Sequence, residues 1–149
     1  MKNEETVSVL NDLLNITMDR IKGFSRVEEK VWETHSYLKN DYEEMTAQSE
    51  QMKSDLIQCI TEHEGEYDDS PTVAGTLHRA WIDVKNAFTK NHAESTLENV
   101  VFGEKSAIAA YQEALQSDKL SPEAILLVQD QHQKLRDSFA KFERLEDIN

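Results

Sequence analysis

The sequence contains very little glycine, proline or aromatic side chain. Its 149 residues include 4 glycines and 2 prolines, and aromatic residues make up only 7% of the chain. Glycine and proline build the turns that all-β folds need in large numbers, so their scarcity argues against such a fold. The remaining sequence is rich in Glu, Lys, Gln, Leu and Ala. These residues favour helices, and we expect helix along nearly the whole chain.

Cysteine is almost absent, because Cys59 is the only one. A single cysteine excludes a disulfide within the chain and any Cys-x-x-Cys motif for zinc or redox chemistry. The sequence also has no glycine-rich loop for phosphate and no run approaching the roughly 18 apolar residues of a membrane span. Its start, MKNEETVSVLNDLL, does not have the pattern of a secretory signal. We therefore expect a cytoplasmic protein without a membrane partner.

Positive charge is also in short supply. There are 16 basic against 29 acidic side chains, which gives a formal net charge of -13. The electric field of such a chain repels the phosphates of nucleic acids and of anionic membranes. We expect an acidic, bacterial-type cytosolic protein that does not bind nucleic acid.

What the sequence does contain is a repeated three-and-four spacing of apolar residues, which predicts five amphipathic helices. Each predicted start carries a capping Asn, Asp or Ser, and both prolines directly follow a capping serine, a typical first helical position. The expected helices run from Asn3 to about residues 37–40, from Asp41 to Gly65, from Ser70 with a buried side that reaches Phe88, from Asn91 to about Ser117, and from Ser121 onward.

Four of these segments are long, and the third is shorter. This pattern favours an all-α antiparallel four-helix bundle, with an additional crossover helix between bundle helices two and three. The length suits one domain, so we expect residues 1–149 to form a single unit. An orthogonal helical array, or a bundle completed by dimerisation, would also satisfy the pattern.

Three phrases, in this order, suggest a known family: VLNDLLNITMDRIKGF at 9–24, DDSPTVAGTLHRAW at 68–81 and GEKSAIAAYQEAL at 103–115. Together they resemble an uncharacterised family of bacterial proteins, a domain of unknown function, classed as ferritin-like four-helix bundles. The resemblance implies an architecture and no defined activity. Because ferritin-like folds often carry a di-iron centre, it also implies a set of metal ligands that can be sought in the sequence.

A di-iron site in such a bundle takes a Glu from each of two helices and a Glu-x-x-His unit from each of the other two. The predicted inward faces offer Glu28, Glu104 and His132. The carboxylate expected before His132 is replaced by Gln129, so half of that unit is missing. These three side chains are the candidate ligands of one iron or manganese ion.

The second predicted helix weakens the case for two metal ions. At the matching level its inward face presents Ser49 and Met52, neither of which is a carboxylate or an imidazole. We therefore expect no di-iron cofactor. Since a buried carboxylate is costly unless it is paired or protonated, we expect Glu104 to meet His132, Gln129 or a lysine across the bundle, or to reach water.

Cys59 and His63 are spaced to face each other on one helix, as a thiolate and imidazole would be for nucleophilic chemistry. Cys59 lies among apolar residues, however, and we interpret it as a small core residue.

The sequence therefore predicts a non-enzymatic module that binds a partner or self-associates, with a homodimer favoured and a role in stress conceivable from the resemblance. The alternative is a ferritin-like metal-binding protein with a reduced or single-metal site. Binding of a small ligand in the Met-lined interior is a third hypothesis.

Overall fold

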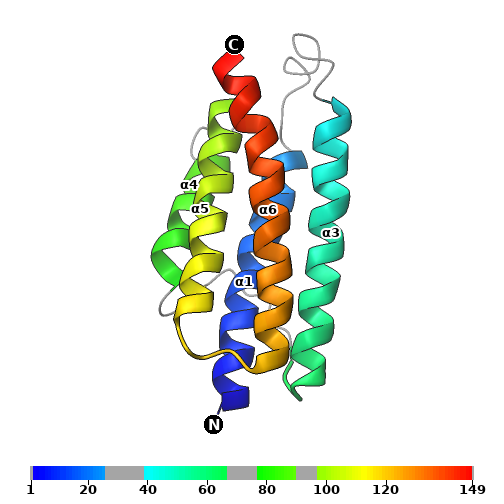
Figure 1. The fold of residues 1–149 in the computed structure, drawn as a ribbon, viewed down its shortest axis with the longest axis vertical. Coiled ribbons are helices and arrows are strands. Elements are labelled where there is room, and N and C mark those ends of the chain that lie inside the picture. Colours follow the sequence, from blue (N-terminus) through cyan, green and yellow to red (C-terminus); the bar gives the residue numbers. More distant parts are fainter. Residues whose placement is uncertain (1, 26–38, 67–76, 90–96, 149) are drawn as a thin grey trace.

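The computed structural model describes residues 2–25, 39–66, 77–89 and 97–148 (Figure 1). Within these ranges every regular element is a helix, so the predicted all-α class is confirmed for them. The elements are α1 Lys2–Ser25, α3 Lys39–Glu62, α4 His78–Thr89, α5 Leu97–Gln116 and α6 Pro122–Ile148.

The four long helices lie side by side around a common interior (Figure 1). Helix α1 neighbours α3 and α5, and α6 neighbours the same two helices from the other side. The shorter α4 packs on the outside, against α1 and α5. Helices α5 and α6 form the predicted antiparallel hairpin, which is joined by residues 117–121.

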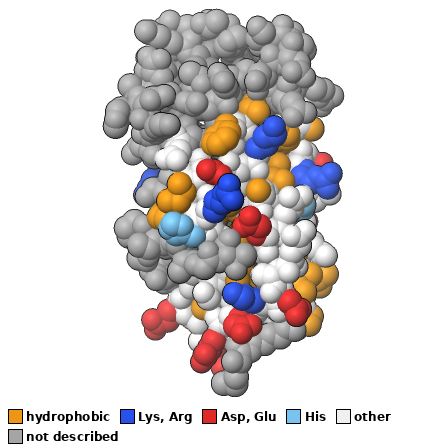
Figure 2. Space-filling view, turned by 90° about the vertical axis from the view of Figure 1, so that its left-hand side faces the viewer, with side chains coloured by type: hydrophobic (Ala, Val, Ile, Leu, Met, Phe, Trp, Pro, Cys, Tyr) orange, Lys and Arg blue, Asp and Glu red, His pale blue; other side chains and the backbone are white. Residues whose placement is uncertain are grey.

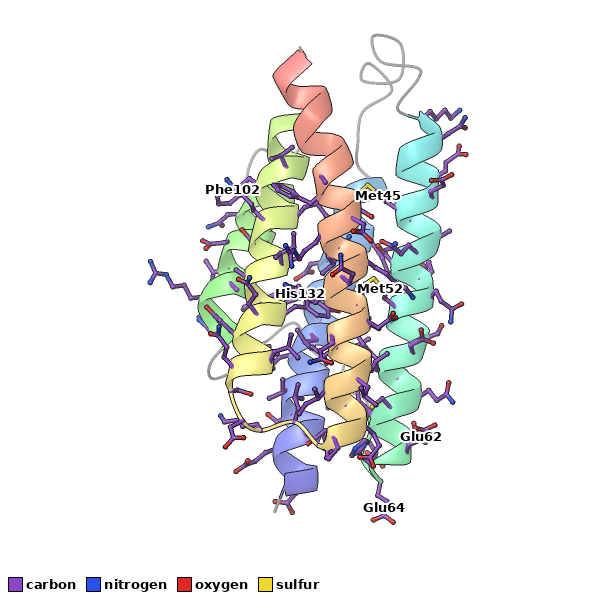
Figure 3. All side chains as sticks on the ribbon, in the orientation of Figure 1. Met45, Met52, Glu62, Glu64, Phe102 and His132 are labelled. Carbon is purple, nitrogen blue, oxygen red and sulfur yellow. The ribbon has the colours of Figure 1, made fainter. Side chains whose placement is uncertain are left out.

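The interior is built mainly from the predicted apolar stripes. On α3 the prediction is confirmed from Met45 to Ile60, and Met45 and Met52 lie on the inner side of this helix (Figure 3). Each large apolar side chain that is fully buried contributes roughly 1.5–3 kcal/mol of transfer free energy. The most deeply buried apolar members are Leu10, Leu13, Leu14, Ile16, Met52, Leu56, Ile60, Leu77, Val84, Tyr111, Val128 and Leu135.

Helix α6 buries only part of its predicted face. Of the predicted stripe, Val128 and Leu135 are fully buried, whereas Ile125, His132 and Phe139 remain partly exposed. The buried face runs through Ala124, Val128, Gln131 and Leu135. Ala124 and Gln131 lie one position before the predicted Ile125 and His132, and an apolar pattern misses them because alanine is small and glutamine is polar.

The predicted cap of the last helix is confirmed. Pro122 is the first residue of α6, and the hydroxyl of Ser121 accepts a hydrogen bond from the amide of Ala124 at 3.2 Å. Two other predicted caps are wrong, because Asn3 lies within α1 and Asp41 lies within α3. The predicted starts at Ser70 and Asn91 fall outside the described residues.

Helix α3 ends in a Schellman motif. The amide of Gly65 donates to Ile60 O at 3.0 Å, and the amide of Glu64 donates to Thr61 O at 3.0 Å. The left-handed residue of the motif is Glu64, with φ of 64°, and not the predicted glycine. Gly65 is needed for a different reason: a Cβ atom there would lie 2.6 Å from Cγ2 of Val7.

Candidate functional site

The centre of the bundle contains a fully buried ion pair between α1 and α5. The Nε of Arg20 donates to one carboxylate oxygen of Glu104 at 2.7 Å, and its Nη2 donates to the other at 2.9 Å. Both side chains have 0% exposure. The planar guanidinium matches the carboxylate in two parallel hydrogen bonds, which is the strongest geometry for such a pair.

This pair identifies the partner of the buried carboxylate. The expected partners of Glu104, namely His132, Gln129 or a lysine, were wrong, and Gln129 is exposed to solvent. Arg20 lies one helical turn after the buried Thr17, so it continues the apolar stripe of α1 inward. A long cationic side chain at that position is easily assigned to the surface, since arginine is rarely fully buried unless it is paired.

A neutral hydrogen-bond network adjoins the ion pair and connects four helices. The hydroxyl of Tyr111 on α5 donates to Oε1 of Gln131 on α6 at 2.7 Å, and it lies 3.4 Å from the hydroxyl of Thr17 on α1. The amide of Gln131 donates to the backbone oxygen of Met52 on α3 at 3.1 Å. Each of these four residues is buried, so the network fixes the helices relative to one another.

Burial affects the phenol of Tyr111. Loss of hydration disfavours the phenolate and raises the pKa of Tyr111 to about 12, against smaller opposing effects of the Thr17 hydroxyl and the Arg20 guanidinium. The tyrosine is therefore a neutral hydrogen-bond donor throughout the physiological range. It serves the network as a fixed donor and is not a proton carrier at neutral pH.

The structure does not bring the three candidate metal ligands into a described cluster. Glu28 lies outside the described residues. Glu104 has both oxygens bound by Arg20. Among the described side chains, no group of three or more His, Cys, Asp or Glu residues has the geometry to hold a metal ion.

His132, the third candidate, lies on the side of α6 that turns toward α5 (Figure 3). Its ring is partly exposed, but its Nε2 atom is buried and has no hydrogen-bond partner among the described residues. Burial, followed by the nearby positive charge of Arg136, lowers the pKa of His132. The ring is therefore neutral near pH 7.

A second polar cluster lies where α3 ends and α6 begins. His63 bridges the two helices: its Nδ1 lies 2.8 Å from the backbone oxygen of Cys59, and its Nε2 lies 2.6 Å from the hydroxyl of Ser121. The Cys59 sulfur is 3.7 Å from Nδ1, so the predicted cysteine and histidine do meet. Sequence spacing could not show Ser121, which is 58 positions away from His63.

The outer face formed around α4 and α5 is chemically mixed (Figure 2). In the described part of this face, apolar, basic and acidic side chains are intermixed, and acidic side chains gather toward the lower end. Below this surface, the indole Nε1 of Trp81 donates to the carboxylate of Asp19 at 2.7 Å, which attaches α4 to α1. The large apolar side chains exposed among the described residues are Ile82, Phe102 and Leu126.

Comparison with known families identifies the chain. Residues 5–117 match the sequence profile of the family described as Domain of unknown function (DUF2383). The chain belongs to this family. The match spans α1, α3, α4 and α5, including both members of the buried ion pair and Tyr111. The expected membership of an uncharacterised family is therefore confirmed, and this family's description assigns no activity to any of these residues.

Comparisons with individual proteins gave no match. No curated protein and no solved structure is significantly similar to the chain. None of the described helices is both long enough and apolar enough to cross a bilayer.

Proposed function

We propose that this protein is a ferritin-like helical bundle that acts by binding a partner or by self-association, with a homodimer as the favoured assembly. The observation that supports this proposal is the bidentate Arg20–Glu104 pair at the centre of the bundle. It occupies both oxygens of the only carboxylate that the described residues place there, and it adds a fixed positive charge beside them.

A buried guanidinium is a poor neighbour for a metal cation. Two like charges a few ångströms apart in a medium of low dielectric constant repel by several kcal/mol, and Arg20 cannot lose its proton to relieve this. In effect, the guanidinium neutralises the carboxylate in the way that a metal ion does in a di-iron bundle. Tyr111 and Gln131 satisfy each other in the adjoining layer. The centre is therefore suited to holding helices together, which leaves the outer surface to make contacts.

The net charge and the cysteine content bear on the partner and on the location of the protein. The net charge of -13 disfavours nucleic acid as a partner, and the lone cysteine fits a reducing cytoplasm.

The metal-binding alternative is supported by one observation, the buried and unpartnered Nε2 of His132. In this alternative, one iron or manganese ion is held by His132 together with Glu28 and Glu104, and the last of these must first leave Arg20.

Two measurements on one preparation decide between these functions. The protein is purified without chelator, its mass is determined by sedimentation equilibrium over a hundredfold range of concentration, and its metal content by mass spectrometry. We expect a mass of twice 17.2 kDa and less than about 0.1 metal ion per chain. A monomer at all concentrations that carries stoichiometric iron or manganese, lost in His132→Ala but retained in the exposed control His78→Ala, would instead establish the metal-binding function.

A further inference from the structure

The cluster at the end of α3 contains a hydroxyl and an imidazole in hydrogen-bond contact. The backbone oxygen of Cys59 can only accept, so the Nδ1 of His63, 2.8 Å away, must carry its proton toward it. In the neutral ring the Nε2 atom is then an acceptor. The hydroxyl of Ser121 donates to it at 2.6 Å, a short distance for this kind of bond.

The neighbours of Ser121 fix its position. Its backbone amide donates to the hydroxyl of Thr6 on α1 at 2.9 Å, and that hydroxyl donates to Lys119 O at 2.9 Å. Its own Oγ accepts the amide of Ala124 at 3.2 Å. The serine is therefore held by α1, α3 and α6 at once, and its hydroxyl has one available acceptor, the imidazole.

The start of α6 lies beside this hydroxyl. The helix runs for 27 residues from Pro122, so the partial positive charge of its first turn is directed at Ser121. The amide of Glu123 lies in that first turn, where helix geometry provides no intrahelical acceptor. An amide of this kind can stabilise an oxyanion that forms at the serine.

Cys59, the other nucleophile of the cluster, is held in its protonated form. Burial, followed by the negative charges of Glu62 and Glu123, raises the pKa of the Cys59 thiol. A thiol is a weak nucleophile compared with a thiolate. The serine hydroxyl, hydrogen-bonded to a base, is therefore the reactive group of the cluster.

We propose that Ser121 and His63 form a nucleophile–base pair that accepts acyl groups from small esters, with Cys59 O orienting the imidazole. Oγ of Ser121 forms a bond to the ester carbonyl carbon while its proton moves to Nε2 of His63. The bond from that carbon to the leaving oxygen breaks, and the proton from Nε2 passes to the departing alkoxide. Water, deprotonated by the same nitrogen, then hydrolyses the acyl-serine to a carboxylic acid.

The surroundings determine the substrate class. Glu62 and Glu123 lie close enough to act electrostatically on this cluster, and both are exposed carboxylates. Ser121 itself retains 6% exposure, so only a small acyl group can reach it. The negative field repels anionic esters and stabilises the imidazolium formed during the reaction. Small neutral or cationic esters are therefore the expected substrates.

The probe for this proposal is diisopropyl fluorophosphate, a small neutral reagent that phosphorylates activated serines with loss of fluoride and a proton. We expect one adduct per chain by intact mass, which peptide mapping places on Ser121.

Two variants keep the fold while removing the chemistry. Ser121→Asp retains a capping oxygen for Ala124 but offers no hydroxyl, and His63→Gln retains a bridge to Ser121 without a base. Circular dichroism and the thermal midpoint of each variant are measured first, to check that it is folded. We expect no Ser121 adduct in the first and labelling at least ~100-fold slower in the second. Ser54→Ala, which changes an exposed serine on α3, the helix that precedes His63, should label like the wild type.

The opposite results are equally clear. If the wild type forms no adduct at Ser121, or if folded His63→Gln labels at the wild-type rate, the cluster only caps α6 and ties it to α3, and the proposal is wrong. Because the cluster lies at the end of the bundle, neither result affects the function proposed above, which is tested by solution mass and metal content.

Discussion

Arg20 and Glu104 are 84 positions apart in the sequence, yet their side chains bind each other through two hydrogen bonds without any exposed surface. Two charges have thus been removed completely from water, at a cost that their mutual attraction must offset. Such a pair adds little net stability compared with apolar side chains of the same size. The loss of only one of the two charges is the costly case, because the other is then buried alone.

The first prediction follows from this asymmetry. Removing one partner, in Arg20→Met or Glu104→Leu, should lower the free energy of unfolding by about 3–5 kcal/mol, because the other charge stays buried without compensation. The double variant should recover most of that loss. Urea unfolding, monitored by circular dichroism, gives the free energy of unfolding of the wild type, the two single variants and the double variant. Single variants that each cost less than about 1 kcal/mol would show that the pair is not sealed from water.

The end of α3 gives the second prediction. Glu64 has a left-handed backbone, with φ of 64°, which costs a side-chain-bearing residue about 1 kcal/mol relative to glycine. Glu64→Gly should therefore raise the free energy of unfolding by roughly 0.5–1 kcal/mol, which a higher thermal midpoint would show.

Gly65→Ala, one residue later, is the matched change and should act in the opposite direction. Its new methyl group would lie 2.6 and 2.7 Å from the two Cγ atoms of Val7. We expect a loss of about 1–3 kcal/mol, largely restored by adding Val7→Ala, which makes room. If Gly65→Ala proved neutral without the second change, the contact between this turn and α1 would be looser than the structure shows.

The contrast between α3 and α6 shows how far an apolar pattern can be followed. On α3 the stripe from Met45 to Ile60 contains large apolar residues at most inward positions, so the helical period can be recognised in the sequence. On α6 the inward positions include Ala124 and Gln131, which are respectively small and polar. Val128 and Leu135 were predicted correctly, but the partly exposed Ile125 and His132 were chosen in place of Ala124 and Gln131.

The candidate site was predictable only in part, for a related reason. Glu104 could be singled out, because a carboxylate between apolar positions on a helix is conspicuous. Its partner Arg20 could not, since a long basic side chain on an amphipathic helix usually extends to water. The Ser121–His63 contact depends on which helix ends meet in space, and no local pattern carries that information.

The third prediction concerns pH and the buried phenol. An unfolded tyrosine ionises near pH 10, whereas in the folded protein the pKa of Tyr111 is raised to about 12. Below pH 10 both states keep the proton and stability does not depend on this group. Between pH 10 and 12 only the unfolded state loses it, so stability falls with rising pH by up to about 3 kcal/mol.

Urea midpoints measured from pH 8 to pH 12 test this expectation, and Tyr111→Phe is the control. The variant should be less stable at pH 8 by about 1–2 kcal/mol, since Gln131 loses its donor, but it should show a shallower decline above pH 10. Parallel declines in the two proteins would mean that Tyr111 is not the titrating group.

The single cysteine allows a last test of how tightly the end of α3 is closed. Cys59 is 5% exposed, and burial together with two nearby carboxylates raises the pKa of its thiol, so little thiolate is present at pH 8. Reaction with a disulfide reagent at that pH should be at least ~100-fold slower in the folded protein than in urea, because it must await local opening. Gly65→Ala, which forces the adjoining turn away from Val7, should speed the reaction while Glu64→Gly should slow it. Equal rates in the three folded proteins would place the opening elsewhere in the bundle, away from the turn that follows α3.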